Sequence, residues 1–518
     1  MSMRGVYTNV TDIRRKIFTE VARMAYEGGS YSRIIDLPYK IIPGEMGTYR
    51  ESVFLERAIV EERLRLAIGL PLRDMREHAP VSKGIEESAI AEKYYDPPLI
   101  NIIKFACHSC PDNIMKVTDV CQGCLAHPCK EVCPKDAISI VNGRSCIDQE
   151  KCIKCGKCTG ACPYGAIMKM ERPCAKACGM DAIGSDYLGR ADIDYEKCVS
   201  CGQCLVSCPF GAISDKGQIF QVIHAIKSGV PVYAAVAPAF VGQFGKDVPQ
   251  ERLREAMKAL GFADIIEVAV GADLCTIEEA KDFMEEVPEK QPFMATSCCP
   301  AWAVMAKKLY PDLASYISMA LTPMVLTGRL IKKEHPDCKV VFIGPCAAKK
   351  LEASRREIRS DVDFVLTFEE VMGMFEAKGI DFTKLEKDDG RLSDASADGR
   401  GFAVSGGVAQ AVVNCIARID PDREVKVASA EGLVNCRQFL ADAKKGKYDG
   451  YLLEGMGCPG GCIGGAGNLQ SQAKAKGQVI LAMKKSGKKC ALENEHKERL
   501  TELEENPDNS CYCEQREQ

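Results

Sequence analysis

The spacing of apolar residues predicts helices early in the chain and mixed α/β structure later. In residues 51–70, apolar side chains recur at intervals of three and four positions, and Gly69 and Pro71 mark the end of the expected helix. From about residue 230, short β-branched runs alternate with helical stretches, as in α/β domains. The runs expected as strands are VYAAVA, DIIEVAV, KVVFIG, DFVLTF and YDGYLL. Loops that follow such strands are the usual place for a functional site.

The distribution of cysteines divides the chain into regions. The 518 residues include 29 cysteines, but none lies in residues 1–106 and 17 lie between Cys107 and Cys208. At this length several domains are expected. We predict a helical N-terminal segment over 1–104, a cysteine-rich α+β region over 105–218, an α/β domain over 219–487, and a charged C-terminal helix and tail over 488–518.

Composition and charge narrow the class of protein. The 46% of apolar residues and 27% of charged residues are typical of globular domains. A net charge of −4 favours neither a nucleic acid nor an anionic membrane as partner. The N-terminal residues lack the apolar core of a signal peptide, and the longest apolar stretch, residues 230–241, is too short to span a bilayer. A cytoplasmic protein is expected, whose thiols bind metal instead of forming disulfides.

The cysteine-rich region contains repeated iron–sulfur motifs. The spacing C-x2-C-x2-C-x3-C-P occurs twice, at Cys152, Cys155, Cys158 and Cys162 and at Cys198, Cys201, Cys204 and Cys208. This is the run of bacterial ferredoxins, in which three cysteines bind one 4Fe–4S cluster and the fourth binds a second cluster. A variant run is formed by Cys121, Cys124, Cys129 and Cys133, and partial runs by Cys107 and Cys110 and by Cys174 and Cys178.

These thiols suffice for four 4Fe–4S clusters. Exchange of the fourth cysteine between runs predicts the sets Cys121/Cys124/Cys129/Cys162, Cys152/Cys155/Cys158/Cys133, Cys198/Cys201/Cys204/Cys178 and Cys107/Cys110/Cys174/Cys208. An alternative for Cys107 and Cys110 is a small zinc site with His108 or His127. Cys146 is left over and is interpreted as a buried thiol. A row of clusters carries electrons over short gaps, so a redox-active group is expected at its end.

Three further cysteine motifs lie in the α/β domain: TSCCPAW (296–302), GPCAAKK (344–350) and EGMGCPGGCIGG (454–465). The last contains G-x-G-x-x-G, but the Cys-Pro within it is incompatible with the usual dinucleotide-binding turn. Together the three motifs resemble the signatures of the iron-only (FeFe) hydrogenases, with a clostridial-type arrangement of ferredoxin-like clusters in front. The resemblance covers roughly residues 105–485.

The resemblance implies a catalytic domain of two sheet-and-helix lobes around an H-cluster, a 4Fe–4S cube joined to a two-iron unit with CO, cyanide and an azadithiolate bridge. Its cube would be bound by Cys299, Cys346, Cys458 and Cys462, with Cys462 bridging to the two-iron unit. Cys298 would carry protons, since a thiol titrates only a little above neutral pH. The remaining implied site residues are Glu279, Ser318 and Asp282 in the proton relay, and Lys349, Pro238 and Met456 around the two-iron unit.

The implied function is reversible conversion of protons and electrons to H2, with ferredoxin or flavodoxin as electron partner and maturation proteins supplying the two-iron unit. Gly344, Ala347 and Ala239 depart from the better-known branch, which has a methionine, a small hydroxyl residue and a serine there, so an altered potential, bias or oxygen sensitivity is expected. Two alternatives remain open: a non-catalytic iron–sulfur carrier or assembly protein, and an H2 sensor.

Overall fold

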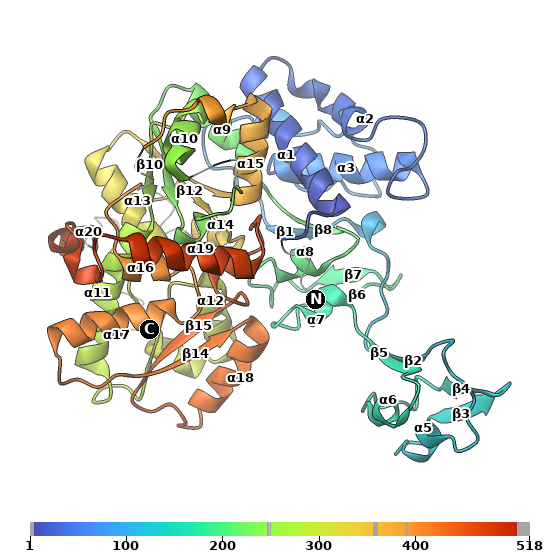
Figure 1. Cartoon of the computed structure of the whole chain (residues 1–518). Coiled ribbons are helices and arrows are strands. Elements are labelled where there is room, and N and C mark those ends of the chain that lie inside the picture. The colour runs from blue at the N-terminus through green and yellow to red at the C-terminus, as the bar shows by residue number, and fades with distance from the viewer. Residues whose placement is uncertain (1–4, 246–247, 249, 356–360, 389–391, 505–518) are drawn as a thin grey trace.

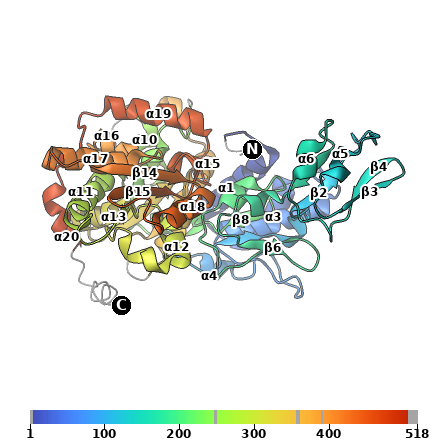
Figure 2. The ribbon, with the colours of Figure 1, turned by 90° about the horizontal axis from the view of Figure 1, so that it is seen from below.

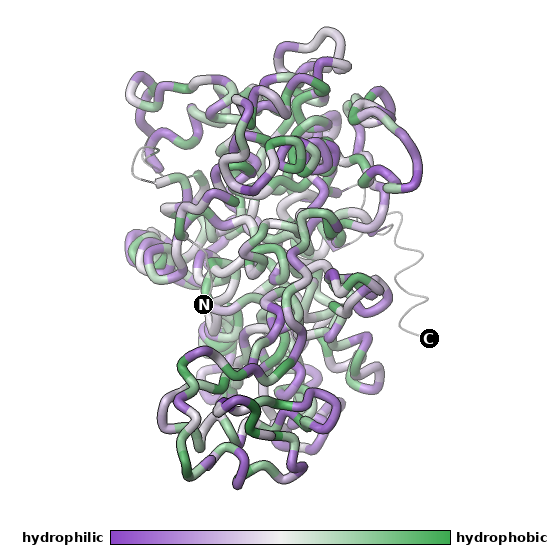
Figure 3. Tube along the Cα trace, turned by 90° about the vertical axis from the view of Figure 1, so that its right-hand side faces the viewer, coloured by the Kyte–Doolittle hydropathy of each residue, from purple (hydrophilic) through white to green (hydrophobic). Residues whose placement is uncertain are grey.

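The computed structural model describes residues 5–245, 248, 250–355, 361–388 and 392–504. Figure 1 shows the N-terminal helices beside the α/β domain, with part of the cysteine-rich region projecting from both. Seen from below, the α/β domain lies at one end of the molecule and the projecting part of the cysteine-rich region at the other (Figure 2). Hydrophobic residues gather in the interior of the trace and hydrophilic residues along the outer loops (Figure 3). Cys511 and Cys513 lie outside the described residues.

The N-terminal segment is helical. Its helices are α1 (Asn9–Glu27), α2 (Leu37–Ile41), α3 (Val53–Ala67) and α4 (Ile85–Ser88). The expected helix over 51–70 is shorter because the Ser52 side chain accepts a hydrogen bond from the N–H of Leu55 and so caps α3. The apolar face of α1 packs with α9 (Ile219–Lys227) and α15 (Phe368–Lys378) in a single hydrophobic cluster. The segment is therefore fixed to the α/β domain.

The cysteine-rich region forms two small ferredoxin-like units. The inner unit contains β1 (Ile100–Ile102) paired with β8 (Ile213–Asp215), the hairpin of β6 (Ile183–Ser185) and β7 (Ala191–Ile193), and helices α7 (Pro173–Lys176) and α8 (Gln203–Ser207). The outer unit contains β2 (Ile114–Val117) paired with β5 (Ile167–Met170), the hairpin of β3 (Ile138–Val141) and β4 (Arg144–Ile147), and helices α5 (Pro128–Glu131) and α6 (Lys157–Ala161). All four pairings are antiparallel.

Two details of this region differ from expectation. Because β1 pairs with β8, residues 100–102 belong structurally to the inner unit, which begins before residue 105. The prediction that Cys146 is buried is wrong, since its side chain is exposed. Cys146 lies on β4, where side chains alternate between the two faces, and it is the neighbouring Ser145 that faces inward.

The α/β domain contains two parallel sheets. The first has the order β10-β9-β12-β13, with β9 (Val232–Val236), β10 (Asp264–Glu267), β12 (Lys339–Gly344) and β13 (Phe364–Thr367). The second has the order β11-β15-β14, with β11 (Met294–Ala295), β14 (Lys426–Glu431) and β15 (Tyr451–Met456). One hydrophobic cluster includes Ala235 of β9, Leu452 of β15 and Leu274 of helix α11 (Ala269–Glu286), so this helix packs against both sheets. The predicted α/β class and ferredoxin-like region are thus confirmed.

The helices of this domain are, besides α9 and α15, α10 (Leu253–Leu260), α11 (Ala269–Glu286), α12 (Pro300–Leu309), α13 (Pro323–Glu334), α14 (Ala348–Glu352), α16 (Ala397–Gly401), α17 (Gly407–Ile419), α18 (Leu433–Ala443), α19 (Gln472–Lys485) and α20 (Leu500–Glu504). The expected strand DIIEVAV stops at Glu267 because the following valines lead into α11. None of the helices in the described ranges has the length and apolar character needed to cross a membrane.

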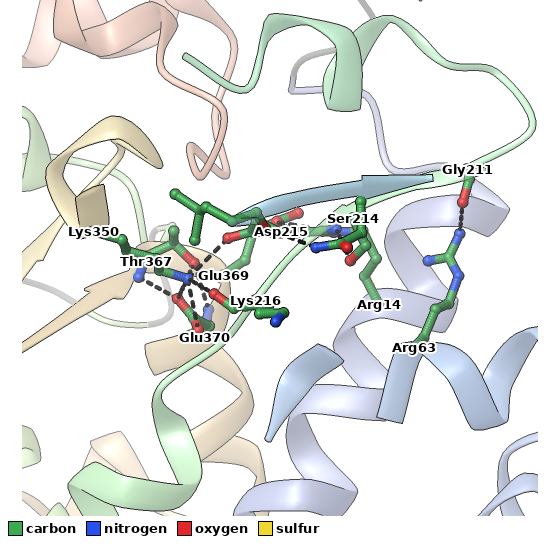
Figure 4. Close-up of polar contacts among 12 residues, drawn as sticks. Arg14, Arg63, Gly211, Ser214, Asp215, Lys216, Lys350, Thr367, Glu369 and Glu370 are labelled. Atoms are coloured by element: carbon green, nitrogen blue, oxygen red, sulfur yellow. Dashed lines mark hydrogen bonds and ion pairs between the residues drawn. The ribbon is translucent and has the colours of Figure 1, made fainter. Parts of the chain in front are cut away.

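A buried network of charges holds the three regions together (Figure 4). Arg14 of α1 contacts Glu369 at 2.8 Å and Asp215 of β8 at 3.4 Å. Lys350 of α14 contacts the same Asp215 at 2.8 Å and Glu370 at 3.1 Å. Each cation therefore reaches a carboxylate of another region, which satisfies the requirement that buried charges be paired. Lys350 is the last residue of the GPCAAKK motif, so the network also positions that loop.

Candidate metal centres and active site

Three small cavities of the ferredoxin-like units are each lined by four cysteines. Their cysteine sets are Cys107, Cys110, Cys174 and Cys208 in the first, Cys178, Cys198, Cys201 and Cys204 in the second, and Cys133, Cys152, Cys155 and Cys158 in the third. These are three of the four sets that the exchange of cysteines between runs predicts. In the first set, the members lie up to a hundred positions apart in sequence, and His108 stacks on Phe210 with ring centroids 4.4 Å apart.

The remaining set, Cys121, Cys124, Cys129 and Cys162, lies in the outer unit. Cys129 and Cys162 pack in the same small hydrophobic cluster as the cysteines of the third cavity. The Cys129 Sγ lies 3.2 Å from the Ser145 hydroxyl. Hydrogen bonds from the backbone N–H groups of Ser145 and Gly123 lower the pKa of the Cys121 thiol. Ser145 therefore brings two members of the set to the same place.

A local hydrogen bond explains why an alanine stands four positions after the last cysteine of each run. In all four repeats, the N–H of an alanine donates to the sulfur of the cysteine four positions earlier: Ala137 to Cys133 at 3.3 Å, and Ala166 to Cys162, Ala182 to Cys178 and Ala212 to Cys208 at 3.4 Å. Such bonds stabilise the negative charge of a bound thiolate. The third repeat keeps the bond although Gly179 replaces the proline, which supports its place in the series.

The inner unit contacts the α/β domain through a side chain that the sequence analysis missed. Gln203 lies between the cysteines Cys201 and Cys204, and its Nε2 donates a hydrogen bond to the Cys458 sulfur at 3.1 Å. A hydrogen bond thus joins the loop of the second cavity to the third motif of the α/β domain. Its position between two ligand cysteines was the available signal, but sequence alone does not show what such a side chain faces.

The three motifs of the α/β domain meet at the carboxyl ends of parallel strands. Cys299 follows β11 and begins α12, Cys346 follows β12 and precedes α14, and Cys458 and Cys462 follow β15. The N–H of Gly457 donates to the Cys299 sulfur at 3.3 Å. Burial, with the neighbouring thiols, raises the pKa of Cys346 and Cys462. Four thiols gathered in this way, with a helix N-terminus behind Cys299, form a site for a group that binds thiolates.

Close packing around the motifs fixes their loops. The Trp302 indole is fully buried and its Nε1 donates to the Thr296 carbonyl at 2.9 Å. A Cβ on Gly455 would lie 2.1 Å from the Trp302 ring, so only glycine fits there. At Gly344, where the better-known branch has a methionine, a Cβ would lie 2.6 Å from the Phe342 ring. The departure at Gly344 therefore follows from the way this chain packs.

Several polar groups lie around Cys298. Cys298 is half-buried, and desolvation together with Glu279 raises the pKa of its thiol well above the ordinary value. Glu279 of α11 accepts a hydrogen bond from the N–H of Ser297 at 3.3 Å and another from Ser318, while its Oε2 is buried without a hydrogen-bond partner. Burial raises the pKa of Glu279 to about 7. Asp282 is half-buried one helical turn further along α11.

The remaining predicted site residues lie around the same motifs. Lys349 lies 2.6 Å from Glu352 and donates to the Thr322 hydroxyl at 3.3 Å. Burial lowers the pKa of Lys349, but the Glu352 carboxylate outweighs this effect and holds the pKa above its ordinary value. Met456 ends β15 and packs with Cys298 and Cys299. Pro238 begins the turn after β9, at the same edge of its sheet as Cys346.

Comparison with known proteins identifies the family. Residues 230–466 match the model of the iron only hydrogenase large subunit, C-terminal domain, and residues 147–167 and 191–214 match 4Fe–4S binding domains. The chain is 31% identical to iron hydrogenase 1 of Clostridium pasteurianum over 66% of this chain and 68% of that protein. The chain belongs to the iron-only hydrogenase family. It is also 32% identical to the periplasmic [Fe] hydrogenase large subunit of Nitratidesulfovibrio vulgaris, over 62% of this chain and 85% of the relative.

Iron–sulfur assembly proteins are more distant relatives of this hydrogenase-family chain. It is 28% identical to cytosolic iron-sulfur assembly component 3 of Mus musculus over 42% of this chain and 57% of that protein. Among solved structures, the [FeFe]-hydrogenase HydA1 from Chlamydomonas reinhardtii is 22% identical with a TM-score of 0.45, covering 53% of this chain and 89% of that chain. Membership of the family therefore rests on the sequence matches.

Proposed function

We propose that this family member is an FeFe hydrogenase that interconverts protons, electrons and H2 at an H-cluster. The observation that carries the proposal is the meeting of the three motifs, where the half-buried Cys298 and the buried Glu279 lie beside four thiols at the ends of parallel strands. Cys299, Cys346, Cys458 and Cys462 would bind the cube, and Lys349, Pro238 and Met456 would surround the two-iron unit. When bound, the H-cluster supplies the two-electron chemistry of H2 formation and cleavage.

The residues present fit this group. A cube needs four thiolates, and the three motifs provide them. The orphaned Oε2 of Glu279 and the protonated thiol of Cys298 leave one buried acid and one half-buried proton carrier beside these thiols. A carboxyl group with a pKa near 7 gains and loses protons readily at neutral pH. Cys298, Glu279, Ser318 and Asp282 would thus pass protons between the site and solvent.

The ferredoxin-like units would deliver electrons through four accessory 4Fe–4S clusters. Cys155 of the projecting outer unit is exposed, which places one set near solvent, where a ferredoxin or flavodoxin would dock. The contact of Gln203 with Cys458 would join the inner unit to the H-cluster cube. We further propose a cytoplasmic, anaerobic setting in which maturation proteins insert the two-iron unit. Protein without that unit should contain about 20 iron atoms in five cubes, against about 12 with only two accessory cubes.

Infrared spectroscopy of anaerobically matured protein tests the proposal. Carbonyl and cyanide stretching bands together with H2/D2O exchange are expected. Absence of these bands after maturation would overturn the proposal and favour a non-catalytic iron–sulfur role, as the match to the mouse assembly protein suggests. A hydrogen sensor would show the bands but little turnover with a reduced ferredoxin.

Replacement of Glu279 tests the proton path. We expect Glu279→Gln to lower H2 production at pH 7 at least about 100-fold, because the amide cannot gain and lose the proton. The infrared bands should remain. Glu278→Gln is a matched control on the same helix: burial and the nearby Glu504 raise the pKa of Glu278 to about 9, so the carboxyl is already neutral at pH 7. Equal loss in both variants would contradict the relay.

Replacement of Gln203 tests the electron path. Gln203→Met removes the donor to Cys458 and should slow ferredoxin-driven turnover roughly tenfold, since a hydrogen bond to a charged group contributes about 1.5–3 kcal/mol. H2/D2O exchange, which needs no external electron, should stay near wild type. Gln122→Met is the control, because Gln122 also lies between two cysteines of a run but is exposed and donates to its own loop. Parallel loss of both activities would contradict an electron-transfer role.

A further inference from the structure

The N-terminal segment places a buried cation against the inner ferredoxin-like unit. Arg63 of α3 is 5% exposed, and its Nη2 donates to the carbonyl oxygen of Gly211 (Figure 4). Its Nε and Nη1 are buried and have no hydrogen-bond partner. Gly211 lies three positions after Cys208, a member of the first cysteine set. The guanidinium group is thus fixed beside this set with two of its donor nitrogens unused.

A second arginine of the N-terminal segment, Arg50, binds backbone carbonyl groups next to two cysteines of the same set. The Nη2 of Arg50 donates to the carbonyl of Phe210 at 2.9 Å and to that of Ala106 at 3.4 Å. Ala106 precedes Cys107, and Phe210 follows Cys208 by two positions. Arg50 and Arg63 also line, with Cys107, a cavity of about 590 Å³ between the N-terminal helices and this loop. Both guanidinium groups therefore face the cysteine loop.

The protein supplies no direct counter-charge for these two cations. Across the described residues, neither Arg50 nor Arg63 forms an ion pair with a carboxylate, in contrast to Arg14, which contacts Glu369 and Asp215. The charged groups that act on Arg63 are Arg14, Arg50, Cys208 and Glu369. The buried carboxyl group of Glu56 lines the same cavity, but its Oε1 accepts hydrogen bonds from the N–H groups of Tyr49 and Arg50 and it forms no ion pair with either guanidinium group. Burial, with the repulsion of Arg14, lowers the pKa of Arg63 to about 9. Because an unpaired buried charge costs several kcal/mol, an anion bound beside Arg63 would stabilise this arrangement.

An iron–sulfur cluster is the anion that fits this place. A 4Fe–4S cluster on four thiolates is net negative in both redox states, and reduction adds one further negative charge. We propose that Arg63 and Arg50 are the charge partners of the cluster on Cys107, Cys110, Cys174 and Cys208, and that the N-terminal segment thereby raises the reduction potential of this cluster. The inference rests on the cluster set of the proposed function. It assigns the N-terminal helices a role in electron transfer.

Redox titration of the full-length protein, followed by electron paramagnetic resonance, tests the inference. The signal of this cluster is identified as the one that Cys110→Ala removes. In Arg63→Gln, we expect its oxidised-to-reduced ratio at the wild-type midpoint to rise at least tenfold, which corresponds to a fall of 59 mV for one electron. Arg50→Gln should shift it in the same direction by less, since Arg50 is only half-buried. Arg63→Lys, which keeps the charge, should restore most of the potential.

Arg57→Gln is the matched control. Arg57 lies on the same helix and likewise donates to backbone carbonyls, those of Ile42 and Gly44 at 3.2 and 2.6 Å, away from the cysteines. An unchanged midpoint in both Arg63→Gln and Arg50→Gln, or a shift no larger than in Arg57→Gln, would overturn the inference. Iron content distinguishes failure of the proposed cysteine set from failure of the proposed role of the arginines. Missing iron and no signal in wild type would overturn the cluster set itself, whereas a normal cluster with an unshifted potential would overturn only the role of the arginines.

Discussion

Cys298→Ala is expected to reduce H2 turnover at least about 100-fold while leaving the metal site assembled. The thiol is half-buried near Glu279, and its raised pKa keeps it protonated at neutral pH, as a proton carrier between the site and the relay requires. Alanine fills most of the same space but holds no proton. The neighbouring Cys299, which begins α12, is unchanged, so the thiols proposed to bind the cube remain in place.

Two measurements separate loss of proton transfer from loss of the site. Infrared bands of carbonyl and cyanide should persist in Cys298→Ala, and H2 production by a gas assay should fall. Cys415→Ala provides the control, because Cys415 is a buried thiol on α17 that lies outside the motifs. Turnover in Cys298→Ala within tenfold of wild type would rule out the thiol as the proton carrier.

Lys350→Met is expected to destabilise the folded protein, because Lys350 joins the inner ferredoxin-like unit to the α/β domain. Lys350 is 1% exposed and donates to Asp215 at 2.8 Å, to the Lys216 carbonyl at 2.9 Å and to Glu370 at 3.1 Å. Removal of the ammonium group leaves two buried carboxylates short of a cation, which costs about 3–5 kcal/mol. A clear fall in melting temperature by circular dichroism should follow. The inner unit and the loop of Cys346 should loosen together, since Lys350 connects them.

The pH dependence of this loss has a definite sign. Burial raises the pKa of Asp215, but the nearby Lys350 and Arg14 outweigh this effect and hold the pKa below its ordinary value. In wild type this stabilises the fold above the ordinary aspartate range and is lost as pH falls through the folded-state pKa. Without Lys350 the pKa rises, so Asp215 takes up a proton under mild acid and the deficit of the variant should shrink. Lys384→Met, at an exposed pair with Asp381, should leave the melting temperature close to that of wild type because solvent screens such a pair.

Features that depend on neighbouring residues could be predicted from the amino-acid sequence. The strand KVVFIG coincides with β12, and VYAAVA contains β9, because short β-branched runs between helices have few alternatives in a parallel sheet. The ligand runs were also readable, since each tight loop and its N–H···S bond to the cysteine four residues earlier involve neighbouring residues only. Burial of Cys146 was wrongly predicted. Side chains on β4 alternate between two faces, and the packing on the hairpin decides which of these faces is buried.

Contacts between distant parts of the chain could not be predicted in this way. The interaction of Gln203 with Cys458 joins residues 255 positions apart, and that of Arg63 with Gly211 joins residues 148 positions apart. Gln203 occupies a variable position of its cysteine run, and an arginine in an amphipathic helix such as that of Arg63 is more often solvated than buried. The packing of the inner unit on the α/β domain decides that Gln203 faces Cys458, and the packing of α3 on the inner unit decides that Arg63 faces the cysteine loop.

The sequence by itself determined the cysteine runs, the exchange of cysteines between runs that three cavities match, and the family, because cysteine spacing and loop chemistry act over a few residues. Only the tertiary structure decided which side chain links the inner unit to Cys458 and which charge lies beside the first cysteine set. The physical reason is that burial and Coulomb interactions depend on distance in space, whereas a motif records only distance along the chain.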